Sequence, residues 1–152
     1  SPMSRDSGLG TRDSANEPRY LRHRLFHEQL DVYRVSKHLA IDLFVETRAF
    51  PRSEQFGLTS QIRRAATSIP ANIAEGAARR SKKEFIQFLG NARGSAAELR
   101  VLLEIAGETA IMPTARCQGH LEVVDRVCLM LSGLIRRNRA PESRVPSPES
   151  RP

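Results

Sequence analysis

The residues whose types and spacing could carry chemistry lie near the middle of the chain. Six basic side chains fall between positions 63 and 83, where only one acidic residue, Glu75, accompanies them. Exposed Arg and Lys side chains bind phosphate oxygens, and free backbone N–H groups at a helix start can add to such a site. The alternative is a solvated charged loop, which charge runs usually form. The candidate nucleic-acid-binding residues are Arg63, Arg64, Arg79, Arg80, Lys82 and Lys83.

A second set of polar residues recurs at helical spacing in the same region. At about 100° per residue, its members gather on one side of a helix. One interpretation is a hydrogen-bond network between helices or subunits, which would fix their register. The other is a groove that faces a ligand, although the spacing matches no known catalytic site. This polar seam comprises Gln61, Arg64, Ser68, Asn72 and Glu75.

The remaining polar residues show no pattern typical of an enzyme. The sequence holds no Ser/His/Asp, Cys/His, paired-carboxylate or Gly-rich phosphate-loop arrangement. His23 and His27 would share a helix face, but no third residue at metal-ligand spacing accompanies them. Cys117 and Cys128 would lie ~16 Å apart on one helix, too far for a disulfide. We therefore expect a non-catalytic protein with no metal and no cofactor, whose cysteines are reduced.

Composition limits the classes of partner. The 152 residues are 39% hydrophobic but only 5% aromatic, which suffices for one core and supplies few rings for stacking bases. The net charge of +7 favours a polyanionic partner, nucleic acid before an anionic membrane surface, although solubility alone would also explain it. No stretch approaches the ~18 apolar residues of a membrane span. We expect a cytoplasmic protein.

The apolar residues predict an all-α domain. Four segments carry a period of 3.6 residues, and no segment alternates as strands do. We predict helices over about residues 28–49, 58–76, 82–108 and 114–136. They would form a four-helix bundle over residues 26–137, between a disordered basic arm (1–25) and a Pro-rich disordered tail (138–152).

Local signals refine these helices. Pro70 lies inside the second segment and should kink it, and Gly76 is placed to end that segment in a left-handed cap. Ser81 begins a capping box, S-K-K-E, at the start of the third segment. Gly90 and Gly94, one turn apart on that segment, predict the close approach of another backbone.

Each predicted helix carries a stripe of apolar residues for the core, and the fourth helix has more apolar residues than a core needs. The first segment contributes Val32, Tyr33, Leu39, Ala40, Leu43 and Phe44. The third contributes Phe85, Phe88, Leu89, Ala92, Ala96, Leu99, Leu103 and Ala106. Apolar residues cover roughly half of the fourth helix, whereas a bundle core needs about three positions in seven. This surplus predicts self-association.

The chain also resembles a known family. The likeness is strongest over residues 57–99, GLTSQIRRAATSIPANIAEGAARRSKKEFIQFLGNARGSAAEL, and extends to residues 30–51, LDVYRVSKHLAIDLFVETRAFP. These runs resemble four-helix-bundle proteins encoded in intervening sequences of bacterial large-subunit ribosomal RNA genes. A related branch is the accessory variability protein of diversity-generating retroelements. The resemblance covers about residues 26–137 and leaves out both tails.

The resemblance implies an antiparallel, up-down-up-down bundle that assembles into a ring-like homopentamer. In the retroelement branch, the ring binds a reverse transcriptase and nucleic acid. The resemblance does not imply a catalytic activity, and the lack of a long apolar stretch leads us to expect no membrane partner. The partners to expect are other copies of the chain, RNA or DNA, and a reverse transcriptase or ribonucleoprotein.

The sequence and the resemblance are consistent with two functions of different classes. The first is a non-catalytic accessory protein that binds the phosphates of RNA or DNA. The second is a homo-oligomeric scaffold or protein-interaction module without specific nucleic-acid binding. A steep dependence of binding on salt would indicate the first.

Overall fold

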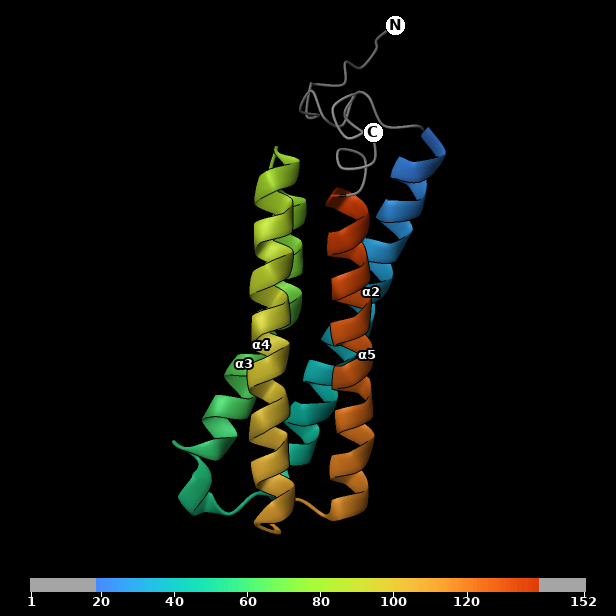
Figure 1. Cartoon of the computed structure of the whole chain (residues 1–152). Coiled ribbons are helices and arrows are strands. Elements are labelled where there is room, and N and C mark those ends of the chain that lie inside the picture. Colours follow the sequence, from blue (N-terminus) through green and yellow to red (C-terminus); the bar gives the residue numbers. More distant parts are fainter. Residues whose placement is uncertain (1–18, 140–152) are drawn as a thin grey trace, which may run out of the picture.

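The computed structural model describes residues 19–139, which form a four-helix structure without strands (Figure 1). The four α-helices are α2 (Arg19–Glu46), α3 (Leu58–Ala77), α4 (Lys82–Glu108) and α5 (Thr114–Arg139). Two short 3-10 helices, η1 (Thr47–Ala49) and η2 (Arg52–Glu54), connect α2 to α3. The predicted all-α class is confirmed.

The helix ends differ from the prediction at both termini. α2 begins at Arg19 rather than near residue 28, so residues 19–25 of the predicted arm are helical. The last helix breaker before this point is Pro18, and no Gly or Pro follows it until Pro51. α5 continues to Arg139, beyond the predicted end at residue 136. The rest of the predicted arm and tail lies outside the described residues.

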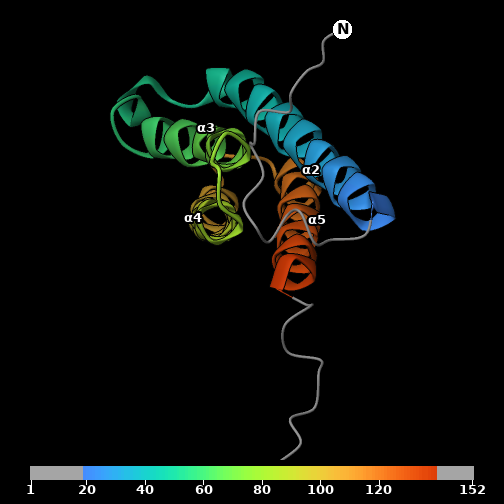
Figure 2. The same ribbon diagram turned by 90° about the horizontal axis from the view of Figure 1, so that it is seen from above.

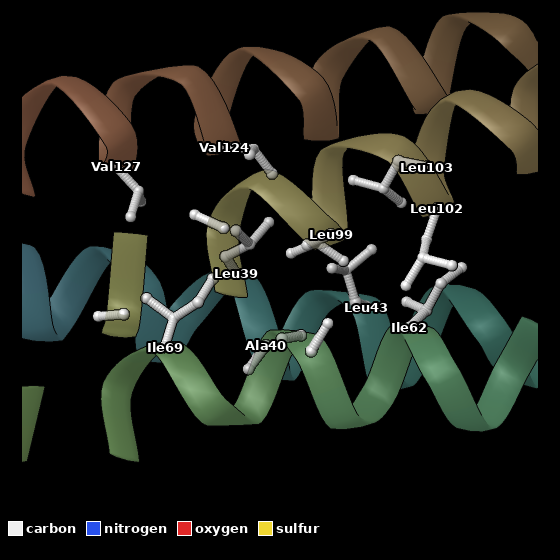
Figure 3. Close-up of a cluster of buried hydrophobic side chains, with 14 of the residues drawn as sticks. Leu39, Ala40, Leu43, Ile62, Ile69, Leu99, Leu102, Leu103, Val124 and Val127 are labelled. Carbon is white, nitrogen blue, oxygen red and sulfur yellow. The ribbon is translucent and has the colours of Figure 1, made fainter. Parts of the chain in front are cut away.

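The four helices pack around one apolar core. α3 packs on α4, α4 packs on α5, and α2 packs on both α3 and α5, which leaves α2 and α4 as a diagonal pair (Figure 2). Figure 3 shows the middle of this core, where side chains from all four helices meet. The largest fully buried side chains are Val32, Leu39, Leu43, Ile62, Ile69, Ile73, Leu89, Leu99, Leu103, Met112, Leu131 and Leu134.

The start of α4 agrees with the predicted capping box. Ser81 is extended, and its Oγ accepts a hydrogen bond from the Glu84 backbone N–H at 3.0 Å. This contact satisfies one of the backbone donors that a helix start leaves free. The side-chain signal therefore fixes where α4 begins.

Within α3, Pro70 agrees with the prediction of a kink, whereas Gly76 does not form the predicted cap. The helix changes direction along its length in both views (Figures 1 and 2), as expected for a helix that contains a proline. Gly76 does not end the helix in a left-handed cap, because α3 continues to Ala77 and Ala78 caps it in a right-handed conformation. A Cβ atom at Gly76 would lie 2.8 Å from Phe88 Cβ. Gly76 thus permits α4 to approach closely.

The close approach that we predicted at Gly90 and Gly94 does not occur within the described chain. A Cβ atom at either position would have nothing within 4 Å. Gly94 is exposed and Gly90 is partly buried.

Two aromatic residues of the predicted core stripes lie at its edge. Phe44 is 38% exposed and Phe88 is partly buried. Each ring is covered by a guanidinium group, Arg63 over Phe44 at 4.7 Å and Arg79 over Phe88 at 4.9 Å between the Cζ atom and the ring centroid. The stacked cations shield apolar surface that the core itself does not cover.

Most of the apolar residues of α5 are buried or partly buried within the bundle. Val127 and Leu134 are buried, and Leu129 is 75% exposed. The exposed apolar residues lie mainly on α2 and α4 instead. The surplus that predicted self-association therefore leaves little exposed apolar surface on α5.

No helix within residues 19–139 is long and apolar enough to span a membrane.

Replacing Gly76 with Ala should lower the free energy of unfolding by about 1–3 kcal/mol, because the added methyl group meets Phe88 Cβ and forces α3 and α4 apart. Gly119 in α5 is the matched control, since a Cβ atom there meets nothing. Gly119→Ala should raise the stability by about 0.5–1 kcal/mol through helix propensity. Urea denaturation monitored by circular dichroism compares the two. A stabilising effect of Gly76→Ala would contradict the close packing at this position.

Candidate nucleic-acid interface

The candidate interface lies at one end of the bundle. The start of α2, the turn between α3 and α4, and the end of α5 all lie at the top of Figure 1. We define the basic end as residues 19–28, 75–84 and 136–139. Its described side chains include three carboxylates, Glu28, Glu75 and Glu84. They also include eight basic groups: Arg22, Arg79, Arg80, Lys82, Lys83, Arg136, Arg137 and Arg139.

Four of the predicted residues form the centre of this end. Arg79 and Arg80 lie in the turn after α3, and Lys82 and Lys83 are the first two residues of α4. Arg80 and Lys83 are exposed, whereas Lys82 is partly buried. The α4 start adds free backbone N–H groups to these cationic side chains, an arrangement that suits phosphate oxygens.

Arg79 is partly engaged within the chain. Its Nη2 atom donates to Glu75 Oε1 at 2.6 Å, and its guanidinium group stacks on Phe88. The Arg79 side chain remains 42% exposed, so the ion pair is open to solvent. A phosphate that approaches this pair would compete with Glu75 for the same guanidinium donors.

Sequence reasoning missed the arginines at the end of α5. Arg136 and Arg139 are exposed in the last turn of α5, which ends at the same end of the bundle as the turn that follows α3. Arg137 donates from Nε to Glu28 Oε2 at 2.7 Å and so ties α5 to α2. Cations also stabilise a helix C-terminus through the macrodipole, which explains their presence without a ligand. The direction in which α5 runs brings Arg136 and Arg139 to the basic end. A prediction of that direction could have assigned the two arginines to the candidate interface.

The structure separates Arg63 and Arg64 from this group. They precede Arg79 by about 24 Å of helix at 1.5 Å per residue. Arg63 donates from Nε to Thr47 Oγ1 at 2.9 Å and from Nη2 to the Phe44 carbonyl at 3.3 Å. Arg63 therefore joins α3 to the end of α2. Arg64 is exposed beside it.

The five residues of the polar seam do not form one network, because each makes different contacts. Ser68 Oγ donates a hydrogen bond to Ser95 Oγ of α4, so one member of the seam links two helices. Asn72 donates from Nδ2 to the Ser68 carbonyl at 2.8 Å within α3, and Glu75 pairs with Arg79. Gln61 and Arg64 are exposed. These contacts favour the structural interpretation at Ser68.

The described residues include no group of three or more His, Cys, Asp or Glu side chains that could hold a metal ion. Both cysteines are free thiols. Burial raises the pKa of Cys117 above its ordinary value, and its Sγ donates to the Leu103 carbonyl at 3.0 Å. Burial also raises the pKa of Cys128. Neither thiol has the lowered pKa of a nucleophile.

Comparison with known proteins gives a family and a fold. The model of the 23S rRNA-intervening sequence protein family matches residues 28–133. A solved structure from Bacteroides thetaiotaomicron VPI-5482, described as a protein with unknown function from the S23 ribosomal protein family, is 24% identical with a TM-score of 0.67. That match covers 72% of this chain and 98% of the other. The comparison with curated proteins finds no match.

Arg63 and Arg64 provide a test of structural against ligand-binding roles, because each Arg→Gln change removes one positive charge. Arg63→Gln should reduce stability by about 1–2 kcal/mol, since it removes a charged hydrogen bond to Thr47 and the stacking on Phe44. Arg64→Gln should change stability by less than about 0.5 kcal/mol. Thermal unfolding of both variants measures the difference. Equal stabilities would show that the Arg63 contacts contribute nothing to the fold.

Proposed function

Because the chain belongs to the 23S rRNA-intervening sequence protein family, we propose that it is a non-catalytic accessory protein that binds RNA or DNA in the cytoplasm. The observation that carries the proposal is the charge of the basic end, where eight basic side chains accompany three carboxylates. Three separate parts of the chain supply these charges. Such a concentration attracts a polyanion far more strongly than the same charges spread over the surface.

The residues at this end suit phosphate rather than bases. Guanidinium groups bind two phosphate oxygens at once, and ammonium groups bind phosphate as point charges. Of the aromatic rings at this end, Phe88 is covered by Arg79, and Phe26, which is 58% exposed, packs edge-on against the His27 ring. Binding through phosphates carries little sequence information. The proposed ligand is therefore a nucleic-acid backbone.

Some of these cations already have carboxylate partners. Arg79 pairs with Glu75 and Arg137 pairs with Glu28. The proposal assigns the principal contacts to four exposed cations outside these pairs: Arg80, Lys83, Arg136 and Arg139. Lys82 and Arg79 would add to them.

We also propose the finer architecture that the resemblance suggests, an antiparallel, up-down-up-down bundle assembled into a ring-like homopentamer. Several basic ends on one assembly would bind one nucleic acid with an avidity that a single copy lacks. A reverse transcriptase or ribonucleoprotein remains a candidate partner of such a ring.

The second candidate function is a homo-oligomeric scaffold or protein-interaction module. Exposed apolar side chains on α2 and α4 favour it: Ile41, Val45, Val101 and Ile105 are each about half exposed, at 46–54%. In that case, the basic end would serve solubility, and its affinity for nucleic acid would match that of any protein of similar charge.

Salt-dependent binding separates the two functions. Changing Arg79, Arg80, Lys82 and Lys83 together to Gln should weaken binding to a fluorescein-labelled duplex. The slope of log affinity against log salt should also become shallower, by about 0.9 for each duplex DNA phosphate that the variant no longer neutralises. Fluorescence anisotropy across a salt series measures both quantities, for DNA and RNA duplexes of the same sequence.

A control variant removes the same charge from other parts of the surface. It changes Arg52, Arg64, Arg116 and Arg126 to Gln, all of which are exposed. The control should keep most of the salt slope, because its residues lie outside the basic end. Equal slopes for the two variants would assign binding to net charge alone and favour the scaffold.

A further inference from the structure

The outward face of α2 carries an apolar pair between two cations. Lys37, Ile41, Val45 and Arg48 follow one another at intervals of three or four residues, so they lie along one side of the helix. Ile41 is 50% exposed and Val45 is 54% exposed. All four line a shallow groove, whose apolar floor continues onto Pro70 of α3. We call these four residues the α2 stripe.

The outward face of α4 carries the opposite arrangement, an apolar pair between two carboxylates. Glu98, Val101, Ile105 and Glu108 also recur at intervals of three or four residues, and all four are exposed. Val101 is 54% exposed and Ile105 is 46% exposed. Gly94 continues the same side of the helix, where added atoms would meet nothing. We call Glu98, Val101, Ile105 and Glu108 the α4 stripe.

The two stripes match in length and charge. Lys37 and Arg48 are separated by about 16 Å of helix, and Glu98 and Glu108 by about 15 Å. Arg48 and both carboxylates have no ion-pair partner within residues 19–139, and Lys37 contacts only the Tyr33 ring, at 5.8 Å. Exposed charges that flank exposed apolar residues are typical of an interface rim around its apolar centre.

The fold prevents the stripes from meeting within one chain. α2 and α4 are the diagonal pair of the bundle, and each stripe lies on the side that faces solvent. The two helices run in the same direction, from top to bottom of Figure 1. Leu43 of α2 lies at the level of Leu99 and Leu103 of α4 (Figure 3). The stripes therefore lie at the same height on opposite sides of the bundle.

We propose that the α2 stripe of one copy packs on the α4 stripe of a second copy. A rotation about the long axis of the bundle brings the stripes together without a shift along that axis, and α2 then crosses α4 obliquely, because α2 is inclined to α4 (Figure 2). Lys37 then lies opposite Glu98 and Arg48 opposite Glu108, while Ile41 and Val45 pack against Val101 and Ile105. The two surfaces differ, so the contact is head-to-tail and closes into a ring when the rotation permits. This inference rests on the self-association in the proposed function and assigns the surfaces that produce it.

The test uses two charge-reversed variants. Lys37→Glu with Arg48→Glu places like charges at the interface, and so does Glu98→Lys with Glu108→Lys. Each double variant should lose the wild-type assembly and give mainly a 17 kDa species by light scattering coupled to size exclusion. Arg64→Glu with Arg126→Glu is the matched control, since both residues are exposed outside the stripes. It should keep the wild-type mass.

The quadruple variant decides between a disrupted interface and an unfolded chain. It carries all four stripe changes, so its α2 stripe is acidic and its α4 stripe is basic, and it should recover the wild-type mass. A wild type that is monomeric at micromolar concentration would overturn the inference. So would double variants that keep their assembly, or a quadruple variant that remains a monomer although folded by circular dichroism.

The same variants distinguish this inference from the proposed function, because the stripes and the basic end share no residue. Labelled duplex is titrated at low salt with each protein. A wild type that assembles through the stripes but does not bind duplex contradicts only nucleic-acid binding. Binding by a wild type that is monomeric contradicts the stripe interface and the proposed ring, and leaves nucleic-acid binding standing.

Discussion

The close packing of α3 against α4 at Gly76 determines how the basic end is built. Only the absence of a side chain at Gly76 lets Phe88 approach, since a Cβ atom there would lie 2.8 Å from that of Phe88. The two helices can therefore be joined by the short segment between Ala77 and Lys82, in which Ser81 caps the second helix. Arg79 then covers the Phe88 ring from outside. The same packing that closes the core thus places the basic side chains of the turn at the surface.

Local signals in the sequence predicted the elements well because their causes are local. Ser81 caps α4 with a residue three positions away, and the 3.6-residue periods of α3 and α4 follow from which residues are apolar. The early start of α2 is not predicted by the sequence pattern, because its first residues are mostly basic and carry no clear period. Gly76 was misinterpreted for another reason. A glycine near a helix end suits either a cap or a close approach, and only the position of Phe88 decides.

The candidate site was predicted only in part, because its composition depends on contacts distant in sequence. Arg63 belongs to a basic run, yet its guanidinium group is held by Thr47 and Phe44, sixteen and nineteen positions earlier. Arg136 and Arg139 are far from that run and become part of the basic end through the direction of α5. A charge cluster in sequence therefore differs from a charge cluster in space, and four of the six predicted residues remain together.

The positions of the two surfaces connect assembly to binding. The stripes run along the sides of the bundle, whereas the basic end closes its top. A rotation about the long axis of the bundle leaves every basic end on the same side of the assembly, so the copies would present their cations together. Their mutual repulsion opposes assembly, and a polyanion that binds across several copies removes that repulsion. By thermodynamic linkage, a nucleic acid that favours the assembled state must bind that state more tightly. Self-association through the stripes and phosphate binding at the basic end would then strengthen each other, although no residue takes part in both.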